Sequence, residues 1–320
     1  MLNTDVAERI NRSLEFQDQE RLAVCDFLDH KKLFYYFSHK KNPDAADRVK
    51  AYHQLGIDIC WRFERRRTKR VGLLKQLVEK YTLRNQQFDL LTQTELTREF
   101  DDFAEQQKLF APYTYLAMSV PGCLNPVHYS LGLENFREQM YVDLIEFERI
   151  FDRLSENLYL RAKRFAAHNF GNIFFIMDTL ANDQGLIFSQ QFLKMSYLPR
   201  VKKAIVPLKQ KNIKVILHSP GNISEIIPEL IEIGINGIHP VESSSGMDSG
   251  MLRKRYANSL LLLCGISLAG KKDEILECTK RIIHSCTHLR GYFIGSSFGI
   301  NNSVELKDIF SFYTAIKEYL

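Results

Sequence analysis

Eight short apolar segments, each followed by a stretch with helical periodicity, constrain the fold of this chain more than any other feature. The segments are 21–27, 57–63, 113–120, 172–178, 214–219, 235–242, 260–267 and 291–297. Several are continuous apolar runs, such as "IFFIM" and "LLLLCGI", and such runs are typical of parallel strands that are covered on both faces. Eight strand–helix units predict an α/β chain folded as a single (β/α)8 barrel of the TIM type.

Two segments outside these units predict additions to the barrel. Residues 1–20 contain a helical pattern that leads into the first strand. Residues 83–102 ("LRNQQFDLLTQTELTREFDD") alternate in polarity, which predicts a small inserted β-hairpin. No linker rich in proline, glycine or serine divides the chain, so we expect residues 1–320 to form one domain.

Composition and charge favour some classes of protein over others. No apolar run reaches the roughly 18 residues that a membrane-spanning helix requires, so we expect no association with a membrane. The six cysteines are scattered without a CxxC pair, which favours a cytoplasmic location over a disulfide framework. The formal net charge of +5 suits an acidic ligand but does not predict binding to nucleic acid.

Polar side chains follow several of the predicted strands, where a TIM barrel carries its chemistry. Asp178 and His218 end neighbouring strands, and we expect them to face each other. A carboxylate beside an imidazole raises its pKa and fixes its tautomer, so the pair is a candidate catalytic acid–base pair. A hydrogen bond that only holds the strand-end loop explains the same pattern equally well.

Four further residues at strand ends are candidates for substrate binding. They are His239, Glu242, Ser296 and Ser297. The alternative for each is an ordinary hydrogen bond at the end of a strand. Cys264 ends another apolar run and is expected to be a small buried residue.

A basic run, "WRFERRRTKR" (61–70), begins where the second predicted strand ends. We expect Arg62 and Arg65 to contact an anionic ligand or partner, because they come first in this run. A solvated helix face is the alternative for the later residues. Trp61 is the only tryptophan and fits either a pocket wall or the core.

The second half of the chain resembles the uroporphyrinogen decarboxylase superfamily. The resemblance rests on "MDTLANDQGLIFSQQFLKMSYLPRVKKAI" (177–205), "VILHSPGNISEIIPELIEIGINGIHPVESSSGMD" (215–248), "LLLCGIS" (261–267) and "GYFIGSSFGI" (291–300). In the first half, "AERINRSLEFQDQERLAVCDF" and "AYHQLGIDICWRF" resemble the cobalamin-linked methyltransferase branch. The resemblance implies a TIM-type barrel and small-molecule chemistry.

The superfamily contains decarboxylases, which act on a porphyrinogen without a cofactor, and methyltransferases, which work with a corrinoid protein and typically with zinc. In the superfamily that this chain resembles, the decarboxylases hold substrate carboxylates with an arginine- and glycine-rich loop of the type "RQAGRYLPEY". At the equivalent place this chain has "CDFLDHKKLFYYF" (25–37). The expected arginine clamp for carboxylates is therefore missing, which disfavours the authentic decarboxylase.

The zinc site of the thiol methyltransferases uses an HxC motif and a second cysteine on the last strand. Here the motif reads His218-Ser219-Pro220, and the last strand ends with Ser296 and Ser297. Because proline and serine are poor zinc ligands, we expect neither zinc nor another tightly bound cofactor. His218, His239 and Cys264 form the one alternative metal site.

The resemblance leaves three hypotheses open. The first is a methyltransferase that works with a corrinoid-binding partner protein and lacks the usual zinc site. The second is a decarboxylase acting on a carboxylated tetrapyrrole or a smaller acid. The third is a catalytically degenerate paralogue that keeps a binding pocket. Dimers are common in the superfamily, so a homodimer is a candidate assembly.

Overall fold

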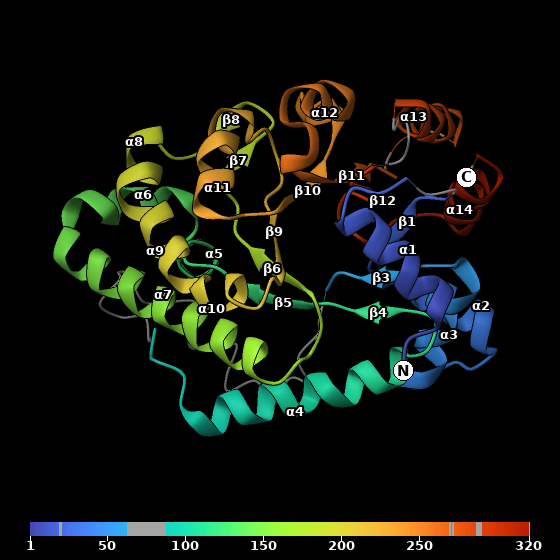
Figure 1. The fold of residues 1–320 in the computed structure, drawn as a ribbon, viewed down its shortest axis with the longest axis horizontal. Helices are drawn as coiled ribbons and strands as arrows, with labels where there is room; N and C mark the ends of the chain where they lie inside the picture. The colour runs from blue at the N-terminus through green and yellow to red at the C-terminus, as the bar shows by residue number, and fades with distance from the viewer. Residues whose placement is uncertain (19–20, 63–87, 269, 271, 286–289, 320) are drawn as a thin grey trace.

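Parallel strands form a closed barrel surrounded by helices (Figure 1) in the computed structural model, which describes residues 1–18, 21–62, 88–268, 270, 272–285 and 290–319. The order of strands in the main sheet is β4-β3-β1-β12-β11-β10-β9-β6-β5. The bounds of these strands are β1 Ala23–Asp26, β3 Ile59–Cys60, β4 Tyr115–Leu116, β5 Met118–Pro121, β6 Ile173–Met177, β9 Lys214–His218, β10 Gly237–Val241, β11 Leu261–Ile266 and β12 Tyr292–Ser296.

The barrel closes through a single stretch of chain. Strands β4 and β5 are separated only by Ala117, and they stand at the two ends of the strand order. Tyr115–Leu116 pairs with β3, whereas Met118–Pro121 pairs with β6. Strands β4 and β5 together form the single predicted segment 113–120, which is hydrogen-bonded to a neighbour on each side. The nine strands therefore correspond to the eight predicted segments. The predicted TIM-type barrel is confirmed.

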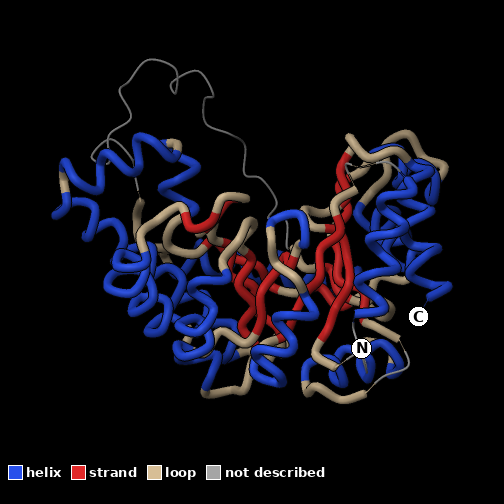
Figure 2. Tube along the Cα trace, turned by 90° about the horizontal axis from the view of Figure 1, so that it is seen from above, coloured by secondary structure: helices blue, strands red, loops and turns tan. Residues whose placement is uncertain are grey.

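Helices cover the outside of the barrel, as the view from above shows (Figure 2). Their bounds are α1 Thr4–Leu14, α2 Lys31–Ser38, α3 Ala45–Leu55, α4 Gln93–Phe110, α5 Asn125–Leu131, α6 Leu133–Val142, α7 Leu144–Ala167, α8 Gln190–Phe192, α9 Leu198–Ala204, α10 Val206–Lys209, α11 Ile227–Ile233, α12 Ser249–Tyr256, α13 Lys272–Ser285 and α14 Leu306–Tyr319. None of the helices in the described part of the chain is long and apolar enough to cross a membrane.

Two small sheets accompany the barrel. Strand β2 (Leu28–Asp29) pairs in parallel with β13 (Ile300–Asn301), so the loops after β1 and β12 are joined. Strand β7 (Ala181–Asn182) pairs antiparallel with β8 (Gly185–Leu186) in the loop that follows β6.

The predicted β-hairpin at 83–102 is wrong for the part that the structure describes. Residues 83–87 lie outside the described residues, and Gln93–Phe110 form helix α4. The helix begins with a capping box in which Thr92 and Glu95 bond each other's backbone N–H groups. Its buried residues Leu96, Phe100 and Phe103 have helical spacing, which the alternating polarity of the surrounding residues had obscured.

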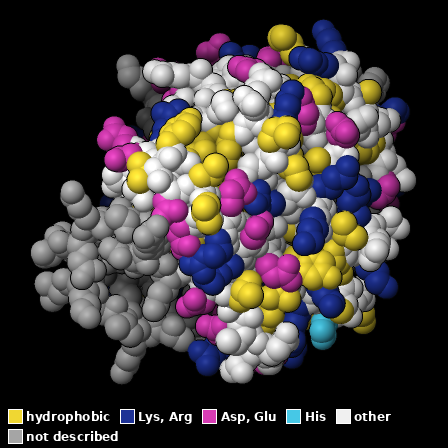
Figure 3. Space-filling model, turned by 90° about the vertical axis from the view of Figure 1, so that its left-hand side faces the viewer, with side chains coloured by type: hydrophobic (Ala, Val, Ile, Leu, Met, Phe, Trp, Pro, Cys, Tyr) yellow, Lys and Arg dark blue, Asp and Glu magenta, His cyan; other side chains and the backbone are white. Residues whose placement is uncertain are grey.

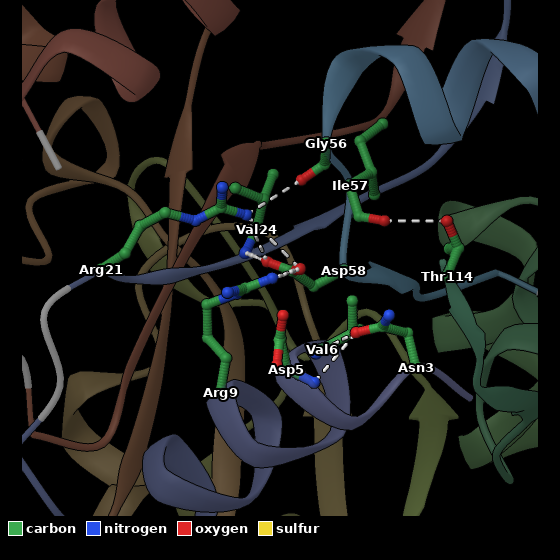
Figure 4. Close-up of polar contacts among 10 residues, drawn as sticks. All are labelled: Asn3, Asp5, Val6, Arg9, Arg21, Val24, Gly56, Ile57, Asp58 and Thr114. Carbon is green, nitrogen blue, oxygen red and sulfur yellow. Dashed lines mark hydrogen bonds and ion pairs between the residues drawn. The ribbon is translucent and has the colours of Figure 1, made fainter. Parts of the chain in front are cut away.

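The helix predicted within residues 1–20 is α1, and a buried carboxylate ties it to the barrel. Asp58 precedes β3 and accepts hydrogen bonds from the guanidinium of Arg9 in α1 at 2.8 Å and from that of Arg21 at 3.2 Å (Figure 4). It also accepts the backbone N–H of Val24 in β1 at 2.8 Å. One carboxylate therefore joins α1, β1 and the segment before β3.

The face formed by α6, α7 and α8 mixes several kinds of side chain (Figure 3). Basic, acidic and hydrophobic groups alternate across it. The exposed large hydrophobic residues of α6 and α7 include Tyr141, Val142, Leu144 and Ile145. The described part of this face therefore carries no stripe of a single charge.

Replacing Asp58 should destabilise the barrel. Asp58→Ala leaves Arg9 and Arg21 without their carboxylate and the buried Val24 N–H without an acceptor, so we expect a loss of about 3 kcal/mol in the free energy of unfolding. Glu8→Ala is the matched control, because it removes an exposed ion pair with Arg12 on the same helix and should cost less than about 1 kcal/mol. Urea denaturation measures both, and equal losses would contradict the assigned role of Asp58.

Candidate functional site

A cavity of about 830 Å³ opens at the carboxyl ends of the barrel strands. Trp61 and Arg62 follow β3, Ser119 to Pro121 belong to β5, and His218 ends β9. The cavity is also lined by Asp29, Asn125, Pro126, Tyr129, Met177, Pro220 and Phe298. These residues come from six of the strand-end loops, so the closed sheet is what assembles the site.

His218 lies in the wall of this cavity, stacked on an aromatic ring. Its imidazole is 4.9 Å from the ring of Trp61, centroid to centroid, with the planes 17° apart. At the edge of the His218 ring, Nδ1 is 2.6 Å from Nδ1 of His239. Burial, followed by the charge of Arg62, lowers the pKa of His218 to about 3. His218 is therefore neutral at physiological pH.

His239 lies behind His218 and not at the cavity surface. It belongs to β10, is 2% exposed, and packs against Trp61 and Phe175. Burial and the neighbouring His218 hold its pKa well below the ordinary value, although a hydrogen bond to the backbone of Ser296 opposes this shift. His239, a candidate for substrate binding, therefore does not line this cavity but contacts His218, which does.

Asp178 does not form the predicted pair with His218. Its carboxylate accepts the backbone N–H groups of Cys123, Leu124 and Asn125 at 2.8–2.9 Å. These groups begin α5, so Asp178 caps that helix. Burial raises the pKa of Asp178 to about 6, against the effect of these hydrogen bonds. The prediction that Asp178 raises the pKa of His218 is wrong, because the Asp178 carboxylate bonds the start of α5 and not the imidazole.

Gly122 allows Asp178 to reach the helix. A Cβ atom at position 122 would lie 1.9 Å from Oδ2 of Asp178, far inside van der Waals contact. The residue before the capped N–H groups must therefore be glycine.

Ser296 belongs to a buried network. Its N–H and hydroxyl donate to Asp26 at 2.9 and 2.6 Å, and the hydroxyl of Tyr313 donates to the same carboxylate at 2.7 Å. Burial raises the pKa of Asp26. These contacts fix the end of β12 and leave Ser296 away from the residues that line the cavity.

Glu242 and Ser297 pair with each other, with the hydroxyl of Ser297 donating to the carboxylate at 2.8 Å. Glu242 lines a second cavity of about 540 Å³, which lies beside α13 and also includes Asp248 and Arg281. The structure therefore divides the predicted ring of polar residues between two cavities and the barrel interior.

Arg62 lines the first cavity, with its guanidinium 5.0 Å from the centre of the Phe27 ring. Arg65 lies outside the described residues. Cys264 is buried in β11. Within the described ranges, no group of three or more His, Cys, Asp or Glu side chains is arranged to hold a metal ion, so the alternative site of His218, His239 and Cys264 is not assembled there.

Sequence reasoning missed several residues of the cavity. Tyr129 and Phe298 are 75% and 56% exposed at its rim. Trp61 was expected to lie either in a pocket wall or in the core, and it does both, because it is buried and also lines the cavity. Its indole N–H has no hydrogen-bond partner among the described residues. The position of Phe298, two residues after the end of β12, was the available signal.

Comparisons with known proteins identify related chains. The family model described as "Uroporphyrinogen decarboxylase (URO-D)" matches residues 108–319. A methyltransferase from Methanosarcina mazei has a similar structure, with a TM-score of 0.72 at 15% sequence identity over 98% of each chain. A B12-independent methionine synthase from Shewanella sp. W3-18-1 gives a TM-score of 0.45 at 14% identity, over 67% of this chain and 64% of that one. A search of curated proteins gave no match.

At such low sequence identities, the similar structures show only that the fold is shared. The family model, in contrast, matches more than half of the sequence and therefore shows the family. The chain belongs to the uroporphyrinogen decarboxylase family.

Proposed function

We propose that this chain is a methyltransferase-like member of its family. It would move a methyl group between a small substrate in the 830 Å³ cavity and a corrinoid carried by a partner protein, without the usual His/Cys/Cys zinc site. The fold shared with the Methanosarcina mazei methyltransferase over nearly the whole chain is compatible with this proposal.

The observation that carries the proposal is the neutral imidazole of His218 in the cavity wall. Decarboxylation leaves a carbanion that must be protonated, and a neutral imidazole, whose remaining N–H is only weakly acidic, is a poor proton donor at pH 7. Methyl transfer instead needs a substrate heteroatom to be held in line with the methyl group. A neutral imidazole can hold such an atom by a hydrogen bond.

The charge of one described lining residue favours an acidic group in the substrate. Arg62 is the one cationic side chain among the described lining residues. One guanidinium can pair with one carboxylate or a similar anion. Within the described part of the cavity, which Asp29 also lines, Arg62 could therefore hold one acidic group of a substrate.

The residues present do not fit zinc. Pro220 stands where the HxC motif of the thiol methyltransferases has its cysteine, and the described side chains contain no group arranged as a metal site. We therefore assign no step of the reaction to a metal ion.

The rim of the cavity suits the approach of a partner. Tyr129 and Phe298 are exposed there beside Arg62, and exposed aromatic residues with arginine are typical of protein interfaces. The corrinoid, when its carrier protein docks, would supply or accept the methyl group. The residues of this chain would bind the substrate, orient it and limit its access to water.

Decarboxylation of a small acid is the second candidate, and the family match itself favours it. A degenerate binding protein is the third. The test is incubation of the purified protein with a methylated corrinoid carrier and candidate acidic acceptors, with spectroscopic detection of demethylated corrinoid. Formation of coproporphyrinogen from uroporphyrinogen, without any methyl transfer, would overturn the proposal.

Two substitutions should separate chemistry from stability. His218→Gln should lower kcat/KM by about tenfold or more, because the substrate loses its oriented hydrogen-bond partner, while the melting temperature changes little. Asp178→Asn should lower the free energy of unfolding by about 1–3 kcal/mol, because its amide NH₂ would face backbone N–H donors. Parallel losses of activity and stability in both variants would contradict this division.

Acid sensitivity should report the buried state of His218. Its folded pKa of about 3 lies below the unfolded value of about 6.5, so stability is lost as pH falls below 6.5. The expected contribution is about 2 kcal/mol between pH 7 and pH 5. Urea denaturation at both pH values measures the free energy of unfolding. The decrease between pH 7 and pH 5 should be smaller in His218→Gln than in the wild type.

The control is His168→Gln, which changes an exposed histidine at the end of α7. It should keep the acid sensitivity of the wild type. If His218→Gln lost as much stability on acidification as the wild type does, the assignment of a neutral His218 in the folded protein would be contradicted.

A further inference from the structure

The second cavity, beside α13, is lined by charged groups of both signs. Its volume of about 540 Å³ lies in the range of small-molecule binding sites. Glu242 and Asp248 belong to the loop that follows β10, whereas Arg281 belongs to α13. None of the described residues that line it lines the first cavity as well. The second cavity is therefore a separate candidate for ligand binding.

Glu242 brings a buried carboxylate to this cavity, with no cationic partner among the described residues. The residue is 6% exposed, and its carboxylate accepts a hydrogen bond from the hydroxyl of Ser297 at 2.8 Å. Gly265 leaves room for that hydroxyl, because a Cβ atom at position 265 would lie 2.9 Å from its oxygen. A hydroxyl supplies one hydrogen bond but no positive charge. The carboxylate therefore gains most from a cationic group that enters the cavity.

Arg281 lies at the same cavity without a carboxylate partner in the part of the chain that the structure describes. Its guanidinium contacts the sulfur of Cys278, which is 3.8 Å from Nη2, and sulfur is a weak acceptor. Glu274 lines the cavity as well, but it has an interaction of its own. A guanidinium pairs with a carboxylate through two parallel hydrogen bonds. Arg281 can therefore bind an anionic group of a ligand.

We propose that this cavity binds a small zwitterion, whose ammonium group pairs with Glu242 and whose carboxylate pairs with Arg281. Amino acids are the simplest members of this class. Asp248 supports the ammonium side, because its Oδ1 caps α12 by accepting the Met251 N–H at 2.7 Å and its Oδ2 is left for the ligand. The site does not depend on the proposed methyl transfer, because its residues are not those of the first cavity.

Ligands with charge of one sign fit this cavity less well than a zwitterion. A simple anion would meet the carboxylates of Glu242 and Asp248, and an organic cation would meet the guanidinium of Arg281. Within the described ranges, no group of three or more His, Cys, Asp or Glu side chains is arranged to hold a metal ion. A zwitterion instead offers a partner of opposite charge to the carboxylates and to the guanidinium at once.

Isothermal titration calorimetry of the purified full chain tests the class of ligand. The probes are glycine, β-alanine and γ-aminobutyrate, which carry both charges at increasing separation, with propionate and propylamine as matched molecules of one charge. At least one zwitterion should bind about tenfold or more tightly than propionate and propylamine, because it makes two charge-assisted pairs in place of one. Binding of none of the zwitterions, or equal binding of a singly charged probe, would overturn the proposal.

Two substitutions test the two charges separately. Glu242→Gln keeps an acceptor for Ser297 but removes the negative charge, so it should weaken zwitterion binding about tenfold or more. Arg281→Gln changes an exposed side chain and should weaken binding to a similar extent without changing the melting temperature. Glu277→Gln and Lys280→Gln are matched controls, because they change exposed residues of α13 that do not line the cavity. Unchanged binding in Arg281→Gln would contradict the site, even if Glu242→Gln fails to fold.

Arg62→Gln tests the location of the bound zwitterion, because Arg62 is the cationic side chain among the described residues of the first cavity. This variant should bind the zwitterion as tightly as the wild type does. Loss of binding in Arg62→Gln, with full binding in Arg281→Gln, would place the ligand in the first cavity and overturn the proposal. The titrations contain no corrinoid, so their outcome is separate from success or failure of the test for methyl transfer.

Discussion

The structure depends on one stretch of chain that is hydrogen-bonded on both sides. Tyr115–Leu116 pairs with β3 and Met118–Pro121 pairs with β6, and this double pairing turns an open parallel sheet into a barrel. An open sheet would leave β3 and β6 at separate edges. Closure brings Trp61, which follows β3, to within 4.9 Å of His218, which ends β9.

Three buried aspartates show how the barrel distributes its polar groups. Asp58 joins helix α1 to β1, Asp178 caps α5, and Asp26 fixes the end of β12. Each carboxylate accepts backbone N–H groups, which compensates for the cost of burial. In a different buried pair, His218 and His239, burial instead favours the neutral state.

Much of the fold could be predicted from the sequence because the barrel strands are buried on both faces and appear as continuous apolar runs. The hairpin prediction failed because the helical spacing of Leu96, Phe100 and Phe103 is hidden among polar residues that also alternate. Local polarity does not distinguish these two patterns over a short segment.

The site was predictable only in part. His218 and Arg62 could be placed at the barrel mouth because each follows a strand. The partner of Asp178 could not be predicted, because it depends on Gly122 and the start of α5, more than fifty residues earlier in the chain. The contact between His218 and His239 depends on strand register, with the two residues paired across β9 and β10. The position of His239 in a predicted strand end was the one signal.

The most direct measurement of the central claim is methyl transfer by protein treated with a metal chelator. A neutral His218 in a cavity whose described residues form no metal site predicts that the rate with a methylated corrinoid carrier is unchanged by the chelator and by added zinc. Loss of activity on chelation, with recovery on addition of zinc, would contradict the account.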